Sequence, residues 1–319
     1  MVVLTEADSG VVGEETTHLL ASLPCIVIAI DRPPADAPML ADVVVEAGVA
    51  SLEDLLESIE DNPVAATSLV LCLRQTSASL GQALIAESAT YSMLQAGGEF
   101  ARWRRSHPVR HRTNADNSAV MIERAGACLR LTLNRPQVRN ALSREMRDGL
   151  LDGLLLALAD PSMTEVVLTG AGSNFSSGGD LDEFGTFSDP GAAHVIRLMT
   201  SVGRAIAALG PRIRVEVHGP CAGSGVELPA FAGHVDARAD FSACLPEVSM
   251  GLIPGAGGTA SITRRIGRHR MALLALSGAT IDAERALRWN LIDRIVGTRV
   301  ISSTDQAPEG HTPSPERNP

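Results

Sequence analysis

Two turns rich in glycine and other small residues each come directly after a short apolar run. The first, Gly170 to Leu181 (GAGSNFSSGGDL), follows Val166-Val167-Leu168, and the second, His218 to Glu227 (HGPCAGSGVE), follows Ile213 to Val217. Glycine lets another group approach the main chain closely, so such turns can present backbone N–H groups to a ligand. Because helical and strand patterns alternate around these turns, the sequence predicts an α/β fold.

Two glutamates accompany the turns in different settings. Glu227 ends the second turn, and Glu247 follows Pro246 in LPEVSMGLIPG. Two acids beside turns that present N–H groups are the parts needed for acid–base chemistry next to a developing oxyanion. Simpler interpretations stay open here. The turns can be ordinary strand-to-helix connections, and Glu247 can be a solvent-facing acid. Ser224 to Glu227 also spells S-x-x-E, so Glu227 can instead close a helix N-terminus in a capping box.

The basic residues narrow the possible chemistry. All 27 are arginine, because the sequence contains no lysine. This excludes a Schiff-base lysine, a lysine base and a phosphate-binding loop that needs a lysine. The net charge of −10 and the lack of a basic motif argue against a nucleic-acid partner. We find no signal peptide and no run of 18 apolar residues. We therefore expect a cytoplasmic protein with no membrane partner.

Cysteine and histidine spacings give no sign of a metal site. The five cysteines are widely separated, odd in number and without a C-x-x-C pair, which favours buried thiols over disulfides or zinc. The histidines show no H-E-x-x-H spacing, and we expect His218 to be structural. Gly170-Ala171-Gly172 lacks the third glycine of a dinucleotide loop, because Phe175 takes that position. We therefore expect neither a metal nor a dissociable cofactor. The cysteines are Cys25, Cys72, Cys128, Cys221 and Cys244.

The N-terminal third mixes strand and helix patterns. Ser51 is a candidate N-cap with Asp54 in the first turn, and Asn62-Pro63 should end that helix. A longer helical pattern bends near Gly97-Gly98. The polar stretch from Ser106 to Asn117 is the best linker candidate. The predicted elements are strands at 25–30, 43–45 and 68–73, and helices at 51–59 and 80–105.

The rest of the chain has a more regular pattern. We predict strands at 128–133, 165–169 and 213–217, with helices at 143–159, 192–209 and 282–290. Pro229 lacks an N–H, so the helix after the second turn should start later or kink. Residues 298–319 are rich in Ser, Thr, Pro and Gly and are expected to form a disordered tail. We therefore divide the chain into an N-terminal α/β extension (1–115), a core (116–298) and a tail (299–319).

Five segments in order resemble the enoyl-CoA hydratase/isomerase (crotonase) family. The resemblance runs from about Ala119 to Gly297, and the five together are far more specific than any one alone. It implies a crotonase-like ββα spiral core beside the N-terminal α/β segment. The segments are LTLNRPQVRNALSREM (131–146), VVLTGAGSNFSSGGDLDEF (166–184), HGPCAGSGVEL (218–228), LPEVSMGLIPGAGGT (245–259) and SGATIDAERALRWNLIDRIV (277–296).

The resemblance implies hydration of a 2-enoyl-CoA. The N–H groups of Gly179 and Ser224 would bind the thioester oxygen, Glu227 would act as base and Glu247 would deliver a proton to C2. Most family members have glycine where this chain has Ser224. Coenzyme A would be part of the substrate, and a homo-oligomer, a trimer or hexamer, is implied. Other family reactions, such as double-bond isomerisation, and a non-catalytic acyl-CoA-binding or partner-binding role stay open. The residues implied for binding coenzyme A and substrate are Arg139, Ala141, Gly179, Asp180, Leu181 and Ser224.

The chain departs from the family at both ends. Typical members continue for several dozen residues past the segment that matches LIDRIVG, in helices that cover the CoA site. Here residues 24–105 are predicted to be a partial, degenerate and catalytically empty repeat that covers the same surface. Ile26 to Pro33 parallels Leu129 to Pro136, and Leu56 to Leu73 parallels Leu154 to Thr169. Two arginine clusters, at 102–112 and 264–270, can meet CoA phosphates or be solvated surfaces.

Overall fold

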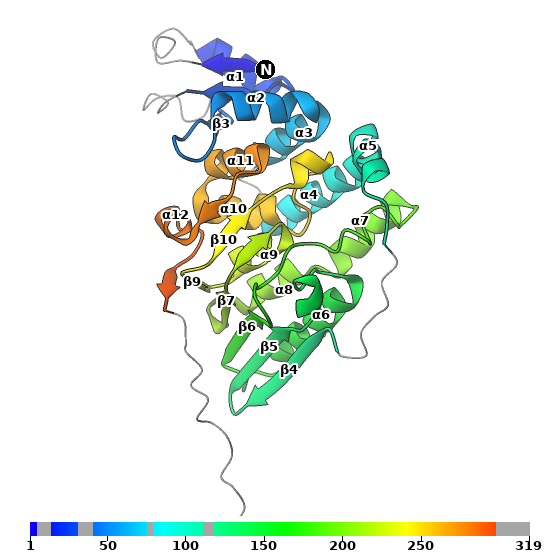
Figure 1. The fold of residues 1–319 in the computed structure, drawn as a ribbon, viewed down its shortest axis with the longest axis vertical. Helices are drawn as coiled ribbons and strands as arrows, with labels where there is room; N and C mark the ends of the chain where they lie inside the picture. Colours follow the sequence, from blue (N-terminus) through cyan, green and yellow to red (C-terminus); the bar gives the residue numbers. More distant parts are fainter. Residues whose placement is uncertain (5–13, 31–40, 76–78, 111–117, 298–319) are drawn as a thin grey trace, which may run out of the picture.

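The computed structural model describes residues 1–4, 14–30, 41–75, 79–110 and 118–297 (Figure 1). The centre of its C-terminal part is a six-stranded sheet in the order β12-β9-β7-β6-β5-β4. Neighbouring strands are parallel except in the antiparallel β4–β5 pair. β6 is a largely buried apolar run, whereas β7 alternates buried apolar residues with the less buried Arg214 and Glu216. The strands are β4 (Val120–Ala125), β5 (Cys128–Leu133), β6 (Glu165–Gly170), β7 (Ile213–Val217), β9 (His234–Arg238) and β12 (Arg294–Val296).

A smaller sheet, β11-β10-β8, completes the strands of this part. β8 and β10 are parallel, and β11 is antiparallel to β10. α6 packs against α8 and against β4 and β5, and the Ser143 side chain caps its first turn. The remaining elements are β8 (Pro220–Ala222), β10 (Ser242–Cys244), β11 (Ile281–Asp282), α6 (Arg144–Ala159), α8 (Val202–Leu209), α9 (Ser224–Glu227), α10 (Gly258–Ile266), α11 (Arg268–Ser277), α12 (Ala283–Arg288), and the 3₁₀ turns η2 (Pro136–Val138), η3 (Gly210–Arg212), η4 (Pro229–Phe231) and η5 (Glu247–Met250).

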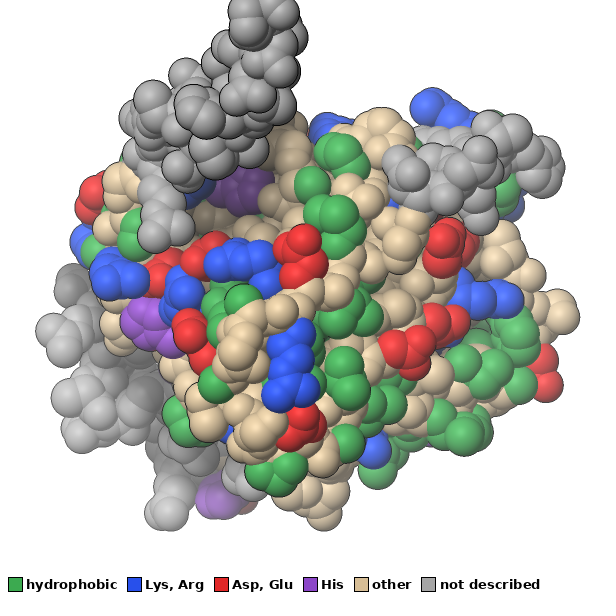
Figure 2. All heavy atoms as spheres, turned by 90° about the horizontal axis from the view of Figure 1, so that it is seen from below, with side chains coloured by type: hydrophobic (Ala, Val, Ile, Leu, Met, Phe, Trp, Pro, Cys, Tyr) green, Lys and Arg blue, Asp and Glu red, His purple; other side chains and the backbone are tan. Residues whose placement is uncertain are grey.

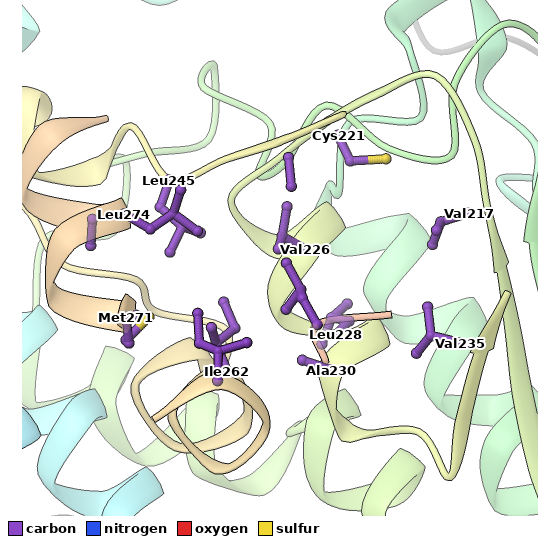
Figure 3. Packing of buried hydrophobic residues seen from close by; sticks show 14 of the residues in the cluster. Val217, Cys221, Val226, Leu228, Ala230, Val235, Leu245, Ile262, Met271 and Leu274 are labelled. Atoms are coloured by element: carbon purple, nitrogen blue, oxygen red, sulfur yellow. The ribbon is translucent and has the colours of Figure 1, made fainter. Parts of the chain in front are cut away.

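The core between these layers surrounds the short helix α9. Figure 3 shows Val226 and Leu228 between strand residues such as Val235 on one side and the α10–α11 residues Ile262 and Met271 on the other. All of these side chains are buried. α9 therefore has little freedom to move, which holds the functional turn at its N-terminus in place.

The described residues up to 110 form an N-terminal segment that packs against this core through four helices, α2 to α5. In Figure 1 it lies over α10 and α11, at the end of the molecule away from β4 and β5. A parallel sheet, β1-β2-β3, stands at its outer edge. Ser51 caps α2 as expected, and the Asp54 side chain completes a capping box with it. The elements are β1 (Val2–Leu4), α1 (Glu14–Ser22), β2 (Val27–Ala29), β3 (Val43–Val44), α2 (Leu52–Asp61), α3 (Pro63–Leu73), α4 (Leu80–Gln95) and α5 (Gly98–Ser106).

The strand predicted at 68–73 is wrong, because these residues form the end of α3. Pro63 occupies the first turn of α3, where proline is tolerated, and starts a helix instead of only ending the previous one. An apolar run of this length suits a buried helix as well as a buried strand. The proposed repeat loses its second half as a result, since residues 56–73 end in a helix and residues 154–169 end in β6.

The helix predicted at 192–209 is two helices, α7 (Pro190–Met199) and α8. Ser201 caps α8 and separates it from α7. By length and mean hydropathy alone, Pro190–Arg212 passes for a membrane span among the described residues, and 28% of its most apolar stretch is buried. A single such segment is weak evidence, and Arg197 and Arg204 interrupt it.

The surface seen from below carries charges of both signs side by side, with apolar side chains scattered between them (Figure 2). Around the buried Asp236, ion pairs join Arg214 and Arg294 to its carboxylate, and Nε2 of His234 lies 3.0 Å from its Oδ1. The fold confirms the α/β class and the N-terminal α/β segment. The domain limits at 115 and 298 and the predicted tail fall in or beside stretches outside the described residues, so they stay predictions.

Candidate active site

A cavity of about 450 Å³ brings together the residues predicted for catalysis. Gly179, Ser224, Glu227 and Glu247 all line it, although they come from three separate stretches of the chain: the loop after β6, α9 and η5. α4 and α7, which pack against each other, supply much of the remaining wall. Other lining residues are Leu84, Glu87, Tyr91, Leu142, Phe184, Ile196, Arg197 and Val202.

The first small-residue turn leaves one N–H group open to the cavity. Leu142 donates its N–H to the Gly178 carbonyl (2.8 Å) and accepts from the Asp180 N–H (3.0 Å), which brackets Gly179. Among the described residues, the Gly179 N–H has no acceptor. A Cβ at position 179 would lie 2.5 Å from the Phe184 ring, so glycine is needed there. The turn therefore presents a fixed and unused donor.

The second turn presents another donor from the start of α9. Gly223 precedes α9 with φ +48°, and a Cβ there would lie 2.5 Å from Oε1 of Glu247. Ser224 is the first residue of α9, so its N–H has no partner within the helix. No other acceptor for this N–H occurs in the described part of the chain. The Ser224 hydroxyl is also buried without a partner.

The capping-box interpretation of Glu227 is wrong. Glu227 is 2% exposed, and its Oε2 accepts hydrogen bonds from the N–H groups of Ala256 and Gly258, both at 2.8 Å. Its carboxylate therefore points away from the N-terminus of α9 and into the cavity wall. The helix after the second turn does not start later, because α9 begins at Ser224. It ends at Glu227, and a separate 3₁₀ turn begins at Pro229, so the proline stands where the helix is broken.

Glu247 is not a solvent-facing acid. It begins η5 and is only 8% exposed. Its Oε2 is buried and has no hydrogen-bond partner in the described part of the molecule. A buried carboxyl oxygen without a partner is costly in a folded protein, and such atoms concentrate where a substrate or a water has to be bound. This oxygen is therefore available to a reactant in the cavity.

Burial makes both glutamates retain a proton more strongly than usual. It raises the pKa of Glu247 to about 7, with Glu87 adding to the rise. Burial and then the nearby Glu247 and Glu87 raise the pKa of Glu227 well above its ordinary value, against the two N–H donors. A pair of carboxyls that holds a proton near neutral pH can supply both an acid and a base.

Sequence reasoning missed Glu87, which reaches the cavity from α4. It is 2% exposed, and burial raises its pKa to about 7. A signal was present, because Leu84, Glu87, Ser88 and Tyr91 recur at the spacing of one helix face, and all four are buried. A glutamate on the buried face of a helix needs a polar partner inside the protein. That partner cannot be identified from the sequence alone.

The residues implied for CoA binding divide into two groups. Gly179, Asp180 and Ser224 line the cavity, and Asp180 pairs with Arg135 at 3.3 Å. Three residues lie outside the lining: Arg139, Ala141 and Leu181. The Arg139 carbonyl accepts the Ser177 N–H at 2.9 Å, so it supports the first turn from behind. Their roles toward coenzyme A stay predictions.

One arginine from each of the two clusters forms hydrogen bonds that hold the fold together. Arg104 donates to the carbonyls of Leu181 and Phe184 and so ties α5 to the first turn. Arg265 donates to the Ala230 and Ala232 carbonyls and pairs with Asp293. Arg112 lies outside the described residues. His218 is structural as expected, with Nε2 3.1 Å from the Gly172 carbonyl oxygen. Among the described residues, no group of three or more His, Cys, Asp or Glu is placed to hold a metal ion.

Ser224→Ala is expected to stabilise the protein. The buried hydroxyl has no partner, so its removal should relieve about 1–3 kcal/mol of desolvation cost. The N–H of residue 224 stays in place, so kcat should not change. The matched control is Ser261→Ala, which removes a buried hydroxyl that donates to the Glu227 carbonyl at 2.8 Å. Thermal unfolding should show a raised midpoint for the first variant and a lowered one for the second. Loss of activity in Ser224→Ala would instead give the hydroxyl a role in the reaction.

Known proteins match the C-terminal part of this chain. The family model described as enoyl-CoA hydratase/isomerase matches residues 123–307. A 2,3-dehydroadipyl-CoA hydratase of Escherichia coli K12 is 32% identical over 178 residues, which are 56% of this chain and 69% of that protein. A 1,2-epoxyphenylacetyl-CoA isomerase of the same organism is 34% identical over 181 residues, which are 55% of this chain and 69% of that protein.

Solved structures match over the same share of the chain. The crystal structure of an enoyl-CoA hydratase from Thermoplasma volcanium is similar with a TM-score of 0.52 and 34% identity, and the match covers 56% of this chain and 72% of that one. The region that the family model matches begins at residue 123. The N-terminal segment, with α4 and Glu87, lies outside it.

Proposed function

Because this chain belongs to the enoyl-CoA hydratase/isomerase family, we propose that it adds water to a 2-enoyl-CoA and forms a 3-hydroxyacyl-CoA. The chain is an acyl-CoA enzyme of the crotonase type. One observation carries the proposal of hydration. Two unused backbone donors, at Gly179 and Ser224, and two buried carboxyls, at Glu227 and Glu247, face the same cavity.

The two donors act on the thioester. Its carbonyl oxygen accepts hydrogen bonds from the N–H groups of Gly179 and Ser224, and these bonds strengthen as negative charge develops on that oxygen. A single donor of this kind is worth roughly 10²–10³ in rate. Since both donors belong to turns that are held by the surrounding backbone, little reorganisation is needed during the reaction.

The two glutamates handle the protons. The oxygen of a bound water attacks C3 while Glu227 takes one of its protons, and Glu247 gives a proton to C2. When Glu247 holds its proton, its like-charge effect on Glu227 disappears. The N–H groups of Ala256 and Gly258 then stabilise the ionised form of Glu227. Transfer of the captured proton back to Glu247 restores the starting state.

A hydration assay tests this proposal. The conjugated enoyl thioester absorbs in the ultraviolet, and its absorbance should fall when the protein is added to 2-enoyl-CoA substrates of increasing chain length. The 3-hydroxyacyl-CoA product should accumulate in equal amount. Conversion of a 3-enoyl-CoA to the conjugated isomer without hydration would favour isomerisation instead. Binding of acyl-CoA without any turnover would show a non-catalytic member.

A further inference from the structure

A third carboxyl of the cavity belongs to Glu87, in the N-terminal segment. It accepts hydrogen bonds from the same backbone turn as the Glu227 carboxylate. We propose that Glu87 is a positioning residue for Glu227: it holds the turn Ala256–Thr259 in the conformation that binds the Glu227 carboxylate. The inference rests on the proposed function, because Glu227 is the proton-transfer group that would be positioned. It also gives the N-terminal segment a part in catalysis.

Alternate N–H groups of the turn point to the two carboxylates. Ala256 and Gly258 donate to Oε2 of Glu227, both at 2.8 Å. Gly257 donates to Oε1 of Glu87 at 2.7 Å, and Thr259 donates to its Oε2 at 2.9 Å. The Thr259 hydroxyl also donates to Oε2 at 2.6 Å, so the Glu87 carboxylate accepts three hydrogen bonds in all. Neither carboxylate can shift without moving the turn that binds the other.

A shift of this turn would be passed directly to Glu227, because the two are packed closely together. Gly257 has φ +107°, and a Cβ at Gly258 would lie 2.8 Å from Oε2 of Glu227. The backbone is therefore in direct contact with the proton-transfer group. A small displacement at a reacting group can cost on the order of a hundredfold in rate. The hydrogen bonds from Gly257 and Thr259 to Glu87 therefore also help to fix the position of the Glu227 carboxylate.

The charges around Glu87 make its effect electrostatic as well as geometric. Glu227 on α9 and Glu247 at η5 carry the same sign of charge as Glu87 when ionised, and Glu87 therefore raises the pKa of both. Arg197 on α7 faces Glu87 with opposite charge and lowers its pKa. Tyr91 on α4 is buried and Cys72 on α3 is half-buried, and loss of contact with water raises the pKa of both, so they stay neutral. A change at Glu87 should therefore alter how Glu227 titrates.

Glu87→Gln is the first test. The amide cannot accept from both Gly257 and Thr259, because its NH₂ group would face one N–H, so the turn should shift and kcat should fall by about ten- to a hundredfold with little change in KM. Loss of the negative charge lowers the pKa of Glu227. The acidic limb of the pH profile of kcat/KM, which follows ionisation of Glu227, should therefore move to lower pH. An unchanged kcat together with an unchanged limb would overturn the proposal.

Two further variants separate position from charge and from general packing. Thr259→Val removes one bond to Glu87 but keeps its charge, so kcat should fall several-fold while the limb stays in place. If Glu87→Gln fails to fold, this variant decides, and a wild-type kcat in it would overturn the proposal. Glu46→Gln is the matched control. Glu46 also joins the N-terminal segment to the core, through Arg285 (2.8 Å) and Trp289 (3.2 Å), but lies outside the cavity. Glu46→Gln should change neither kcat nor the acidic limb of the pH profile of kcat/KM.

A titration without substrate distinguishes failure of this inference from failure of the proposed function. Protein with ¹³C in the glutamate carboxyls is titrated by NMR, and the Glu227 signal is assigned by its loss in Glu227→Gln. The Glu227 midpoint should be lower in Glu87→Gln than in wild type and unchanged in Glu46→Gln. This result would support the coupling even if the protein hydrated no enoyl-CoA. An unmoved Glu227 midpoint would overturn it even in an active hydratase.

Discussion

Glu247→Gln is expected to lower kcat for hydration by about 10²–10⁴-fold while the fold is kept. The amide has nearly the same shape as the acid, but it cannot deliver a proton to C2. Oε2 of Glu247 has no hydrogen-bond partner in the described structure, so its replacement by an amide NH₂ breaks no internal hydrogen bond. Glu227→Gln should show a loss of similar size, because the amide cannot take the proton of the attacking water.

The measurement is kcat and KM on a short 2-enoyl-CoA, with circular dichroism to confirm the fold. Glu216→Gln is a suitable control, since Glu216 is on β7 outside the cavity and forms ion pairs with Arg130 and Arg214. It should behave as wild type. If Glu227→Gln or Glu247→Gln keeps nearly full kcat, the role assigned to that residue is wrong.

Removal of residues 1–116, which leaves a protein that starts at Asn117, is expected to abolish activity and cause aggregation. α2 and α3 pack on α11, and α3 and α4 pack on α10 (Figure 1). Each large side chain buried there, such as Leu55 or Leu69, contributes roughly 1.5–3 kcal/mol. A few of them together match the total stability of about 5–15 kcal/mol that is usual for a folded protein. The shortened protein also lacks Glu87.

A single-residue comparison tests the same interface without a large deletion. Leu69 and Leu71 lie on α3, but Leu69 is fully buried whereas Leu71 is 37% exposed. Leu69→Asp should lower the soluble yield and the unfolding midpoint sharply, because it buries an unpaired charge. Leu71→Asp should have a small effect. A shortened protein that stays soluble and as active as the full chain would refute the covering role of the N-terminal segment.

Local features of the sequence were enough to predict β5, β6 and β7 and the turns after β6 and β7, but not β8 to β12. The GSNFSSGGD and HGPCAGSG turns follow apolar runs, and the structure has a strand before each of them. Glycine is required at 179 and 223 because neighbouring groups lie too close for a Cβ. The positions of Glu227 and Glu247 could be inferred from their turns and from the resemblance. Such features are predictable because they depend on residues a few positions apart.

The sequence alone left open how these residues are used. A capping box at Ser224 and a solvent-facing Glu247 were both consistent with the local pattern, and only the packed structure excludes them. The helix at 68–73 was misread because an apolar run has no period that separates a buried helix from a buried strand. Which of the two forms depends on the elements that pack around it.

Glu87 shows most clearly what only the tertiary structure decided. Its hydrogen bonds reach Gly257 and Thr259, 170 and 172 residues away along the chain. The pKa of a carboxyl depends on the water, the charges and the N–H groups that surround it, and here most of these come from distant segments. Local sequence determines which groups are available and in which turns they stand. Packing of distant segments determines which of them are buried together, and burial is what gives the carboxyls of this cavity their unusual affinity for protons.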